Sequence, residues 1–488
     1  MTRITLADAA LLAALTAAAL AVHGYHLGVE DQAIYLPAAK WHLDPALYSH
    51  DADFFLRHTR WTLADELLAG TMQATGLPLD WTLFAWHILS VFAFLLACLR
   101  LARALFDEAH AQWAAVMLMA SLLTMPAAGT LVPILGQYLH PRALVAPILV
   151  YLLAAPFLPF GPRLRRWRWR APMGLFGIAF LIHPTMTLFC AWHFLFAMGA
   201  SLAAVIPPAA MFLPVPETWW ELAQVRRHLF PLRWTWYELL GAVAPMLLLW
   251  WFARMAAKDG GQTRALLCRS VAISGSIGVA GAFLISVLPW TRVLVPAEPM
   301  RVLHLVYVAL IVVGGGLLGR HILNTRAWRW ALLFVPLAGG MWYAQRAQFP
   351  ASAHIDWPGR LPANPWVEAF DWIRLHTPRD ALIALDPRHM ELDGNDAHGF
   401  RAFAERSMLA DAVKDRAVAI VYPEMLERWR REVAARQRWT SFGEKEFLGL
   451  REKFGVTWIV VSAGHPTAAL PCPFQNAAVK VCTAAGRS

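Results

Sequence analysis

Long runs of apolar residues, each of about 20 residues and almost free of charge, recur through the first two thirds of this chain. A run of that length spans the hydrocarbon core of a bilayer as a helix, because backbone groups in lipid must be hydrogen-bonded within the spanning element. The runs are continuous, whereas strands of a membrane β-barrel alternate apolar and polar residues. We therefore predict an α-helical polytopic membrane protein.

The apolar runs predict about 9–11 transmembrane helices. The first covers residues 7–25 and resembles a signal peptide in its small residues, but we expect it to be retained, since a polytopic protein needs no cleaved leader. The other predicted spans lie near residues 82–104, 112–131, 143–160, 173–190, 191–212, 236–254, 270–288, 302–319 and 328–346.

Basic residues gather in short loops between these runs, so the net charge of +10 does not indicate a nucleic-acid partner. Cytoplasmic loops are enriched in Lys and Arg, which predicts that the loops at 163–170, 254–269 and 320–329 are cytoplasmic and that the C-terminal part lies outside. Three helices fall between the first two loops, where an even number is needed. We expect the chain to be broken or re-entrant at His183-Pro184, since proline removes a helix hydrogen bond. A miscounted helix elsewhere would resolve the mismatch as well.

Composition changes near residue 350, where Pro, Asp, Arg and Glu become frequent and the spanning runs end. We predict a transmembrane domain over residues 1–349, including an external loop at 26–80, and an external (periplasmic) domain over 350–488. In this tail, helical periodicity alternates with short buried strands, which is typical of a small soluble α/β domain. The predicted helices are 366–376, 423–437 and 444–453, and the predicted strands are 381–385 and 458–461.

Acidic residues stand directly after the first apolar helix. Glu30 and Asp31 come where the chain leaves the bilayer, and Asp51 and Asp53 follow in the same loop as secondary candidates for catalysis or metal binding. Ionisable groups facing lipid cost solvation energy and usually mark a functional cavity. A carboxylate here is suited to act as a general base or as a metal ligand, while a solvated loop carboxylate is an equally good interpretation of any single one.

The residues around the acidic pair resemble those of a known superfamily. Tyr35 follows four residues after Asp31, and the stretch with Pro45, Leu47 and Tyr48 comes next. This pattern resembles the first external loop of the GT-C superfamily, membrane glycosyltransferases such as protein O-mannosyltransferases and the lipid A aminoarabinose transferases. The layout of a many-helix half followed by an external α/β domain is similar as well.

The resemblance implies roles for particular residues. The superfamily's proposed catalytic base falls on Asp31 or Glu30, and the order Glu-Asp leaves open which of the two acts. The implied donor is a polyprenyl-phosphate-linked sugar. Its phosphate needs basic residues near the outer face, for which Arg142, Arg292 and Arg301 are the candidates. An interfacial arginine that extends to lipid headgroups is the alternative for each.

Four further residues have less specific predictions. Tyr35 and His183 are expected to line the cavity, although a histidine in an apolar run is more often a packed core residue. Cys472 and Cys482 lie in the polar tail and would pair if that part faces an oxidising compartment. Two unpaired thiols are the alternative.

These features predict a membrane glycosyltransferase that moves a sugar from a polyprenyl-phosphate carrier to a lipid, glycan or protein acceptor at the outer face of the membrane. The alternative is a non-catalytic transporter or lipid-handling scaffold, but no internal repeat of the kind common in transporters stands out. We expect membrane lipids and the lipid-linked donor as partners, no nucleic acid, and a multi-pass protein of the bacterial inner membrane. We predict no cofactor, and the sequence leaves open whether a divalent metal ion binds.

Overall fold

The computed structural model describes residues 4–157, 170–199, 217–466 and 470–484. By its contacts the chain divides into two compact units: Met1–His23 with Trp86–Tyr343, and Gly24–Ala85 with Ala344–Ser488. The loop after the first helix is therefore grouped with the C-terminal tail, although the two are far apart in sequence. The domain boundary near residue 350 rests on composition rather than on contacts, and it stays a prediction.

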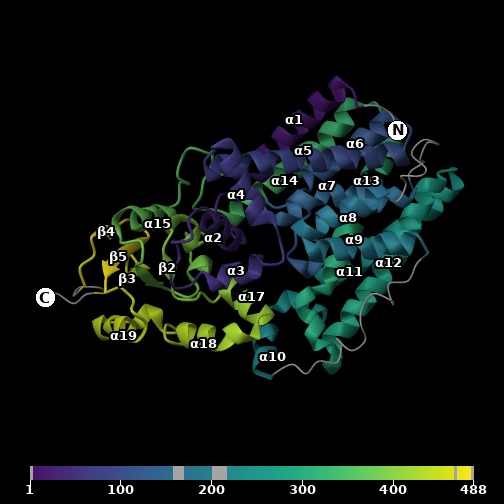
Figure 1. Ribbon diagram of the computed structural model, residues 1–488. Coiled ribbons are helices and arrows are strands. Elements are labelled where there is room, and N and C mark those ends of the chain that lie inside the picture. Colours follow the sequence, from purple (N-terminus) through teal and green to yellow (C-terminus); the bar gives the residue numbers. More distant parts are fainter. Residues whose placement is uncertain (1–3, 158–169, 200–216, 467–469, 485–488) are drawn as a thin grey trace. The chain divides into compact units, whose positions relative to one another are not determined.

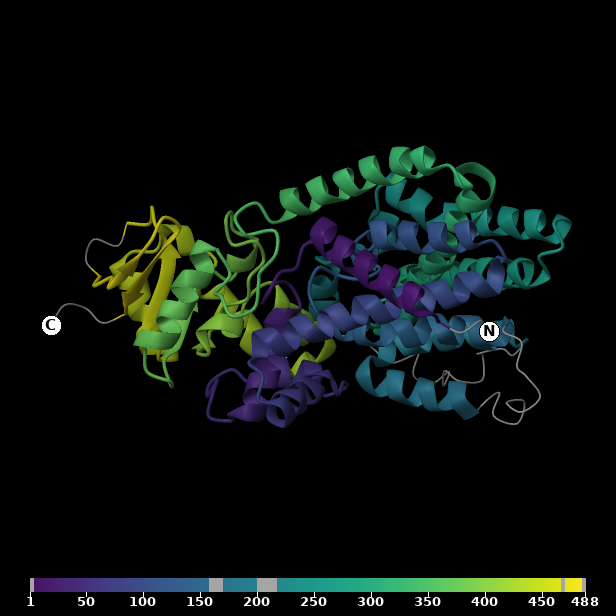
Figure 2. The same cartoon turned by 90° about the horizontal axis from the view of Figure 1, so that it is seen from above.

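Helices build the first unit (Figures 1 and 2). They are α1 (Leu6–His23), most of α5 (Leu79–Leu105), α6 (Ala109–Ser121), α7 (Pro141–Ala154), α8 (Arg170–Ile182), α9 (Pro184–Ala197), α10 (Glu217–Gln224), α11 (Trp236–Lys258), α12 (Gln262–Val287), α13 (Leu303–Leu318) and most of α14 (Ala327–Gln348). Short 3-10 turns cover Ala128–Thr130, Ala155–Phe157, Arg227–Leu229, Pro231–Arg233, Pro289–Ala297 and Pro299–Val302, and a π-turn covers Gly319–Leu323.

The predicted fold class is confirmed: a polytopic helical protein with a small α/β region near its C-terminus. Among the described residues, five helices are long and apolar enough to cross a membrane, at Leu6–His23, Leu79–Leu105, Trp236–Lys258, Gln262–Val287 and Pro299–Leu323. Shorter apolar helices lie at Pro141–Phe157, Arg170–Ile182 and Pro184–Ala197. The basic loop predicted at 163–170, apart from Arg170, and the second half of the predicted span 191–212 lie outside the described residues.

A break at His183-Pro184, predicted from the proline, is present: α8 ends at Ile182 and α9 begins at Pro184. The predicted boundary between spans at residues 190 and 191 is wrong, because α9 continues through it. Proline at the first helical position costs no hydrogen bond, since that N–H has no partner within a helix. The His183 ring supplies the cap, with its Nδ1 accepting from the Met186 N–H at 3.4 Å.

Small residues let α13 approach α6 closely. A Cβ added at Gly315 would lie 2.8 Å from the Cα of Ala115, and one added at Gly319, just after α13, 2.7 Å from the Cα of Ala111. Membrane helices gain their mutual packing from such backbone contact rather than from the hydrophobic effect, which is weak between lipid-like surfaces. Any larger side chain at either glycine would separate the two helices.

The second unit combines helices with one sheet. Its helices are α2 (Gln32–Leu43), α3 (Asp53–Thr59), α4 (Ala64–Thr75), α15 (Pro365–His376), α16 (Phe400–Ala404), α17 (Lys414–Val421), α18 (Leu426–Ala434) and α19 (Glu444–Phe454). Its strands are β1 (Leu382–Leu385), β2 (Ser407–Met408), β3 (Trp458–Ser462), β4 (Phe474–Gln475) and β5 (Val479–Thr483). Short 3-10 turns cover His389–Glu391, Pro423–Met425 and Trp439–Ser441.

The sheet has the order β2-β1-β3-β5-β4, with β1 parallel to β2 and β3, and β5 antiparallel to β3 and β4. Figure 1 shows the sheet in the C-terminal part of the chain. Side chains alternate between the faces of a strand. Leu382 on β1 and Ile459 on β3 join a buried cluster with Phe447 of α19. The predicted helices at 366–376 and 444–453 and the predicted strands are confirmed within one or two residues. The helix predicted at 423–437 is shorter at both ends: a 3-10 turn replaces its first turn, and α18 ends at Ala434.

Candidate active site

Glu30 and Asp31 lie side by side at the entrance to α2, and both bind the same lysine. The ammonium of Lys414, the first residue of α17, donates to Oε2 of Glu30 at 2.8 Å and to Oδ1 of Asp31 at 2.9 Å. The side chains of Glu30 and Asp31 are 38% and 39% exposed, so they are open to a substrate, while Lys414 is largely covered. With both carboxylates ionised, these three groups have a net charge of −1. The site is therefore a partly exposed pair of carboxylates that binds the ammonium of Lys414.

Backbone pairing with the tail fixes the loop that carries this pair. The N–H of Glu30 donates to the carbonyl of Ala397, and the N–H of Gly399 donates to that of Gly28, each at 2.9 Å. Gly28 has φ of +73°. A Cβ at Gly28 would also meet the ring of Phe403 at 2.3 Å, so both conformation and space require glycine there. Residues of the tail therefore set the backbone position of Glu30.

Asp51, the secondary acidic candidate, belongs to a buried ion-pair cluster. Arg401, only 4% exposed, donates through Nε to Asp51 Oδ2 at 2.6 Å. It donates through Nη1 and Nη2 to the two oxygens of Asp415 at 2.9 and 2.8 Å. Asp411 accepts the N–H groups of Val413 and Lys414 and so shapes the chain that enters α17. The cluster thus positions the residue that binds Glu30 and Asp31.

The pKa shifts in this cluster follow from burial without enough cations. Burial raises the pKa of Asp51 and raises that of Asp415 to about 6, and Arg401 opposes both shifts. Burial alone would lower the pKa of Arg401, but Asp415 and Asp51 raise it well above its ordinary value. Removal of the arginine would leave buried carboxylates uncompensated, which is far more destabilising than loss of a surface pair.

Asp53 and Tyr35 occupy different surroundings from Asp51. Asp53 is the exposed first residue of α3. Tyr35, on α2, is buried, with its ring edge-to-face against His58 at a centroid distance of 5.8 Å. Metal binding by Asp51 and Asp53 and a cavity-lining role for Tyr35 stay predictions.

A cavity of about 560 Å³ lies along α2, the helix that begins after Asp31. Leu36, Lys40 and Leu43 of α2 line it, together with Arg374 and Phe403 of the tail. Lys40 donates to Oε1 of Glu405 at 2.7 Å. The cavity therefore offers both apolar walls and charged groups within the second unit.

In the first unit, basic side chains gather around two His-Pro helix starts. His140 caps α7 with its Nδ1 accepting from the Arg142 N–H at 2.9 Å, and its ring centroid lies 5.6 Å from that of His183. His183 is within electrostatic range of His140, Arg142 and Arg301. Because Nδ1 of each histidine accepts a hydrogen bond, a neutral ring carries its proton on Nε2. The structure thus brings together three of the predicted residues, Arg142, His183 and Arg301.

Arg301 and Arg292 each have an acidic partner. Nε of Arg301 donates to Oε2 of Glu298 at 2.6 Å. Arg292 lies apart from that group, 3.5 Å from Glu217 and over the ring of Trp220 at 4.3 Å. Phosphate binding by these arginines stays a prediction, and the surroundings of Arg142 and Arg301 favour it more than those of Arg292.

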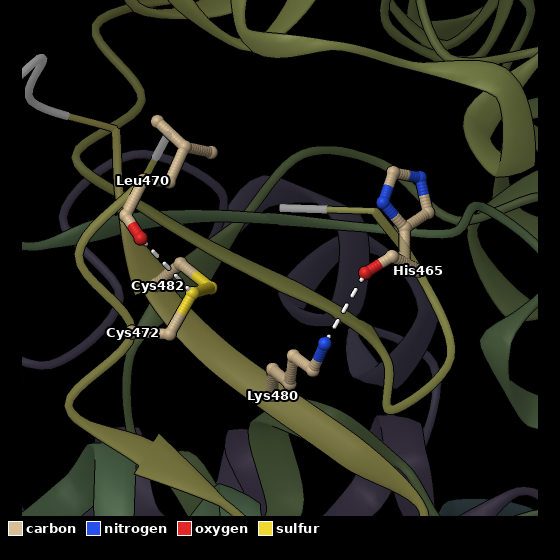
Figure 3. The surroundings of a disulfide bond; sticks show 5 residues. All are labelled: His465, Leu470, Cys472, Lys480 and Cys482. Atoms are coloured by element: carbon tan, nitrogen blue, oxygen red, sulfur yellow. Dashed lines mark hydrogen bonds between the residues drawn. A yellow bond between two sulfur atoms is a disulfide. The ribbon is translucent and has the colours of Figure 1, made fainter. Parts of the chain in front are cut away.

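The tail contains a disulfide between Cys472 and Cys482, which closes the hairpin of β4 and β5 (Figure 3). Leu470 and Lys480 flank it, and Lys480 donates to the carbonyl of His465 at 3.3 Å. The remaining cysteines, Cys98, Cys190 and Cys268, are free and buried.

Sequence reasoning missed Lys414 and the partners of Arg401. Lys414 stands in a polar stretch, Asp411 to Asp415, that looks like any solvated turn followed by a helix. Nothing local indicates that its partner precedes it by 383 residues.

No protein-family model matches the sequence, and no curated protein matches it. Among solved structures, the chain is similar to the crystal structure of ArnT from Cupriavidus metallidurans bound to undecaprenyl phosphate. The match has a TM-score of 0.46 at 15% sequence identity and covers 98% of each chain. A likeness of this strength does not show a function for this chain.

Proposed function

We propose that this protein is a membrane glycosyltransferase of the GT-C type, which transfers a sugar from a polyprenyl-phosphate carrier to a lipid, glycan or protein acceptor. The observation that carries the proposal is the pair Glu30 and Asp31, which is partly exposed, fixed by backbone pairing and bound to Lys414. Positioned carboxylates are suited to remove a proton from an acceptor hydroxyl or amine.

In the proposed reaction, Asp31 or Glu30 takes the acceptor proton as the acceptor oxygen or nitrogen bonds to the anomeric carbon. The bond from that carbon to the phosphate oxygen breaks with inversion, and the electron pair leaves on the polyprenyl phosphate. Lys414 holds both carboxylates in place by its two hydrogen bonds. Positioning of this kind lowers the entropic part of the barrier.

The leaving phosphate needs cationic or donor groups where negative charge develops. We assign this role to the group of His140, Arg142, His183 and Arg301 in the first unit, because two guanidinium groups and two imidazole N–H donors suit a phosphate. We also propose that the tail lies outside the cytoplasmic membrane of a bacterium.

Lipid analysis of the purified protein tests the donor. Mass spectrometry of lipids that co-purify with the full chain should find polyprenyl phosphate or its sugar-linked form. The amount should fall in Arg142→Gln and Arg301→Gln and stay unchanged in Arg254→Gln, which alters an arginine that lies over Trp250. Only ordinary phospholipids, in equal amounts in all variants, would contradict the assignment and favour the scaffold alternative.

A further inference from the structure

Three side chains of the second unit, none of them Glu30 or Asp31, form a group that could bind a metal ion. His42 lies near the end of α2, and Asp65 and Glu66 lie in the first turn of α4. One potential metal-ligand atom from each lies within 4.8 Å of the others. Nε2 of His42 is 3.1 Å from Oδ2 of Asp65 and 3.9 Å from Oε1 of Glu66.

Asp65 is the unusual member of this group. Its side chain is 1% exposed, and its Oδ1 is buried without a hydrogen-bond partner in the described structure. A buried carboxylate oxygen without a donor is costly, because the water that it loses on folding is not replaced.

Helix electrostatics explains only part of the group. Acidic residues in the first turn of a helix interact favourably with its dipole, and His42 can pair with them as a cation. That explanation accounts for Glu66 and for Oδ2 of Asp65. It gives no reason for a second carboxylate oxygen to be buried without a donor beside another acid.

We propose that His42, Asp65 and Glu66 bind a divalent transition-metal ion, with Zn²⁺ as the best match, and that the ion fastens α2 to α4. One imidazole nitrogen and two carboxylate oxygens form a donor set that zinc accepts, with a fourth position left for water. The ion would satisfy Oδ1 of Asp65 and offset the two negative charges. The site does not depend on the proposed glycosyl transfer, since its ligands are separate from Glu30 and Asp31.

Metal binding is measured directly on the full chain, purified in detergent without a histidine tag. After treatment with EDTA and its removal, Zn²⁺ is titrated against a chromogenic chelator, and bound zinc is counted by elemental mass spectrometry. The ligand variants are His42→Gln and Glu66→Gln, which change side chains that are not fully buried. The matched controls are His50→Gln and Asp393→Asn, which alter an exposed histidine and an exposed carboxylate of the same unit.

We expect one tightly bound Zn²⁺ per chain in the wild type and in both controls, with at least a tenfold weaker affinity in each ligand variant. Zinc should raise the melting temperature of the wild type and of the controls but not of the ligand variants, because an ion that binds only the folded state stabilises it. Absence of saturable binding, or equal affinity in His42→Gln, Glu66→Gln and the wild type, would overturn the proposal.

Discussion

Lys414 Nζ lies 2.9 Å from Oδ1 of Asp31, although 383 residues separate the two in the chain. The contact joins the start of α17 to the residue that precedes α2, and the backbone of Glu30 pairs with Ala397 nearby. The first loop and the tail therefore form one folded unit. A chain cut after Arg346 would remove the partners of the loop itself, so point substitutions test the site better than truncation does.

Lys414→Met should reduce sugar transfer strongly while changing stability little. The substitution keeps an unbranched side chain of similar size and removes the ammonium that binds Glu30 and Asp31. Because both carboxylates are more than a third exposed, we expect a loss of stability of about 1 kcal/mol or less. Transfer rate and melting temperature are measured together. Lys445→Met, at an exposed lysine of α19, should leave both unchanged. An unaltered rate in Lys414→Met would show that the contact only ties loop and tail together.

Arg401→Met should destabilise the second unit by about 3–5 kcal/mol, because Asp51 and Asp415 would remain buried without their cation. The change should appear in thermal or denaturant unfolding of the second unit. Arg388→Met serves as the matched control, since Arg388 pairs with Glu391 on the surface and its loss should cost about 0–1 kcal/mol. Equal effects of the two substitutions would contradict the buried cluster.

Because Asp356 is buried, we expect the free energy of unfolding to fall as the pH rises toward neutrality. Burial raises the pKa of this carboxyl to about 7, and the hydrogen bond from the Leu27 N–H opposes the shift. A carboxyl with a raised pKa in the folded state stabilises fully below its ordinary value of 3.8, and its contribution is lost as the pH rises through about 7. The free energy of unfolding falls by at most about 1.4 kcal/mol per pH unit from this group.

Asp356→Asn tests this pH dependence, because asparagine keeps an acceptor for Leu27 without a charge to lose. Between about pH 5 and about pH 8, the wild type should lose more stability than the variant. The same comparison with Asp393→Asn, at an exposed carboxylate, should show no difference from wild type. Parallel pH curves for wild type and Asp356→Asn would contradict the assignment.

The disulfide between Cys472 and Cys482 leaves three free thiols in the chain, which alkylation can count. Denatured, unreduced protein should react with an alkylating reagent at Cys98, Cys190 and Cys268 only, and all five cysteines should react after reduction. Intact-mass analysis reads both counts. Alkylation of all five without a reductant would mean that Cys472 and Cys482 are thiols in the cell, which would argue against a tail in an oxidising compartment.

Local physics explains what the sequence could predict. The apolar runs predict the helical membrane half, and the proline at Pro184 marks the break between α8 and α9 correctly. Alternating short elements in the tail predict the α/β domain, with β1 and β3 placed within one residue. Two-residue strands such as β2 and β4 leave no periodic signal, because their pairing partners supply most of their definition.

Part of the candidate site could likewise be predicted from the sequence, and part could not. Glu30 and Asp31 stand out because acidic residues beside an apolar helix are rare and costly. The environment of Asp51 was not predictable, since Arg401 reaches it across 350 residues of chain. His42, Asp65 and Glu66 likewise have no ligand spacing in sequence, because the packing of α4 against α2 brings them together across the segment that contains α3.

Sugar transfer by a variant that lacks both proposed bases tests the central claim most directly. The double variant Glu30→Gln, Asp31→Asn keeps acceptors for Lys414 and removes the ability to take a proton. With polyprenyl-phosphate-linked sugars from the native membrane as donors, we predict a rate at least about 100-fold below wild type, with melting temperature and bound lipid unchanged. The matched control Asp393→Asn, at an exposed carboxylate, should transfer at the wild-type rate. Transfer by the folded double variant at the wild-type rate would contradict the assignment of Glu30 and Asp31 as the catalytic pair.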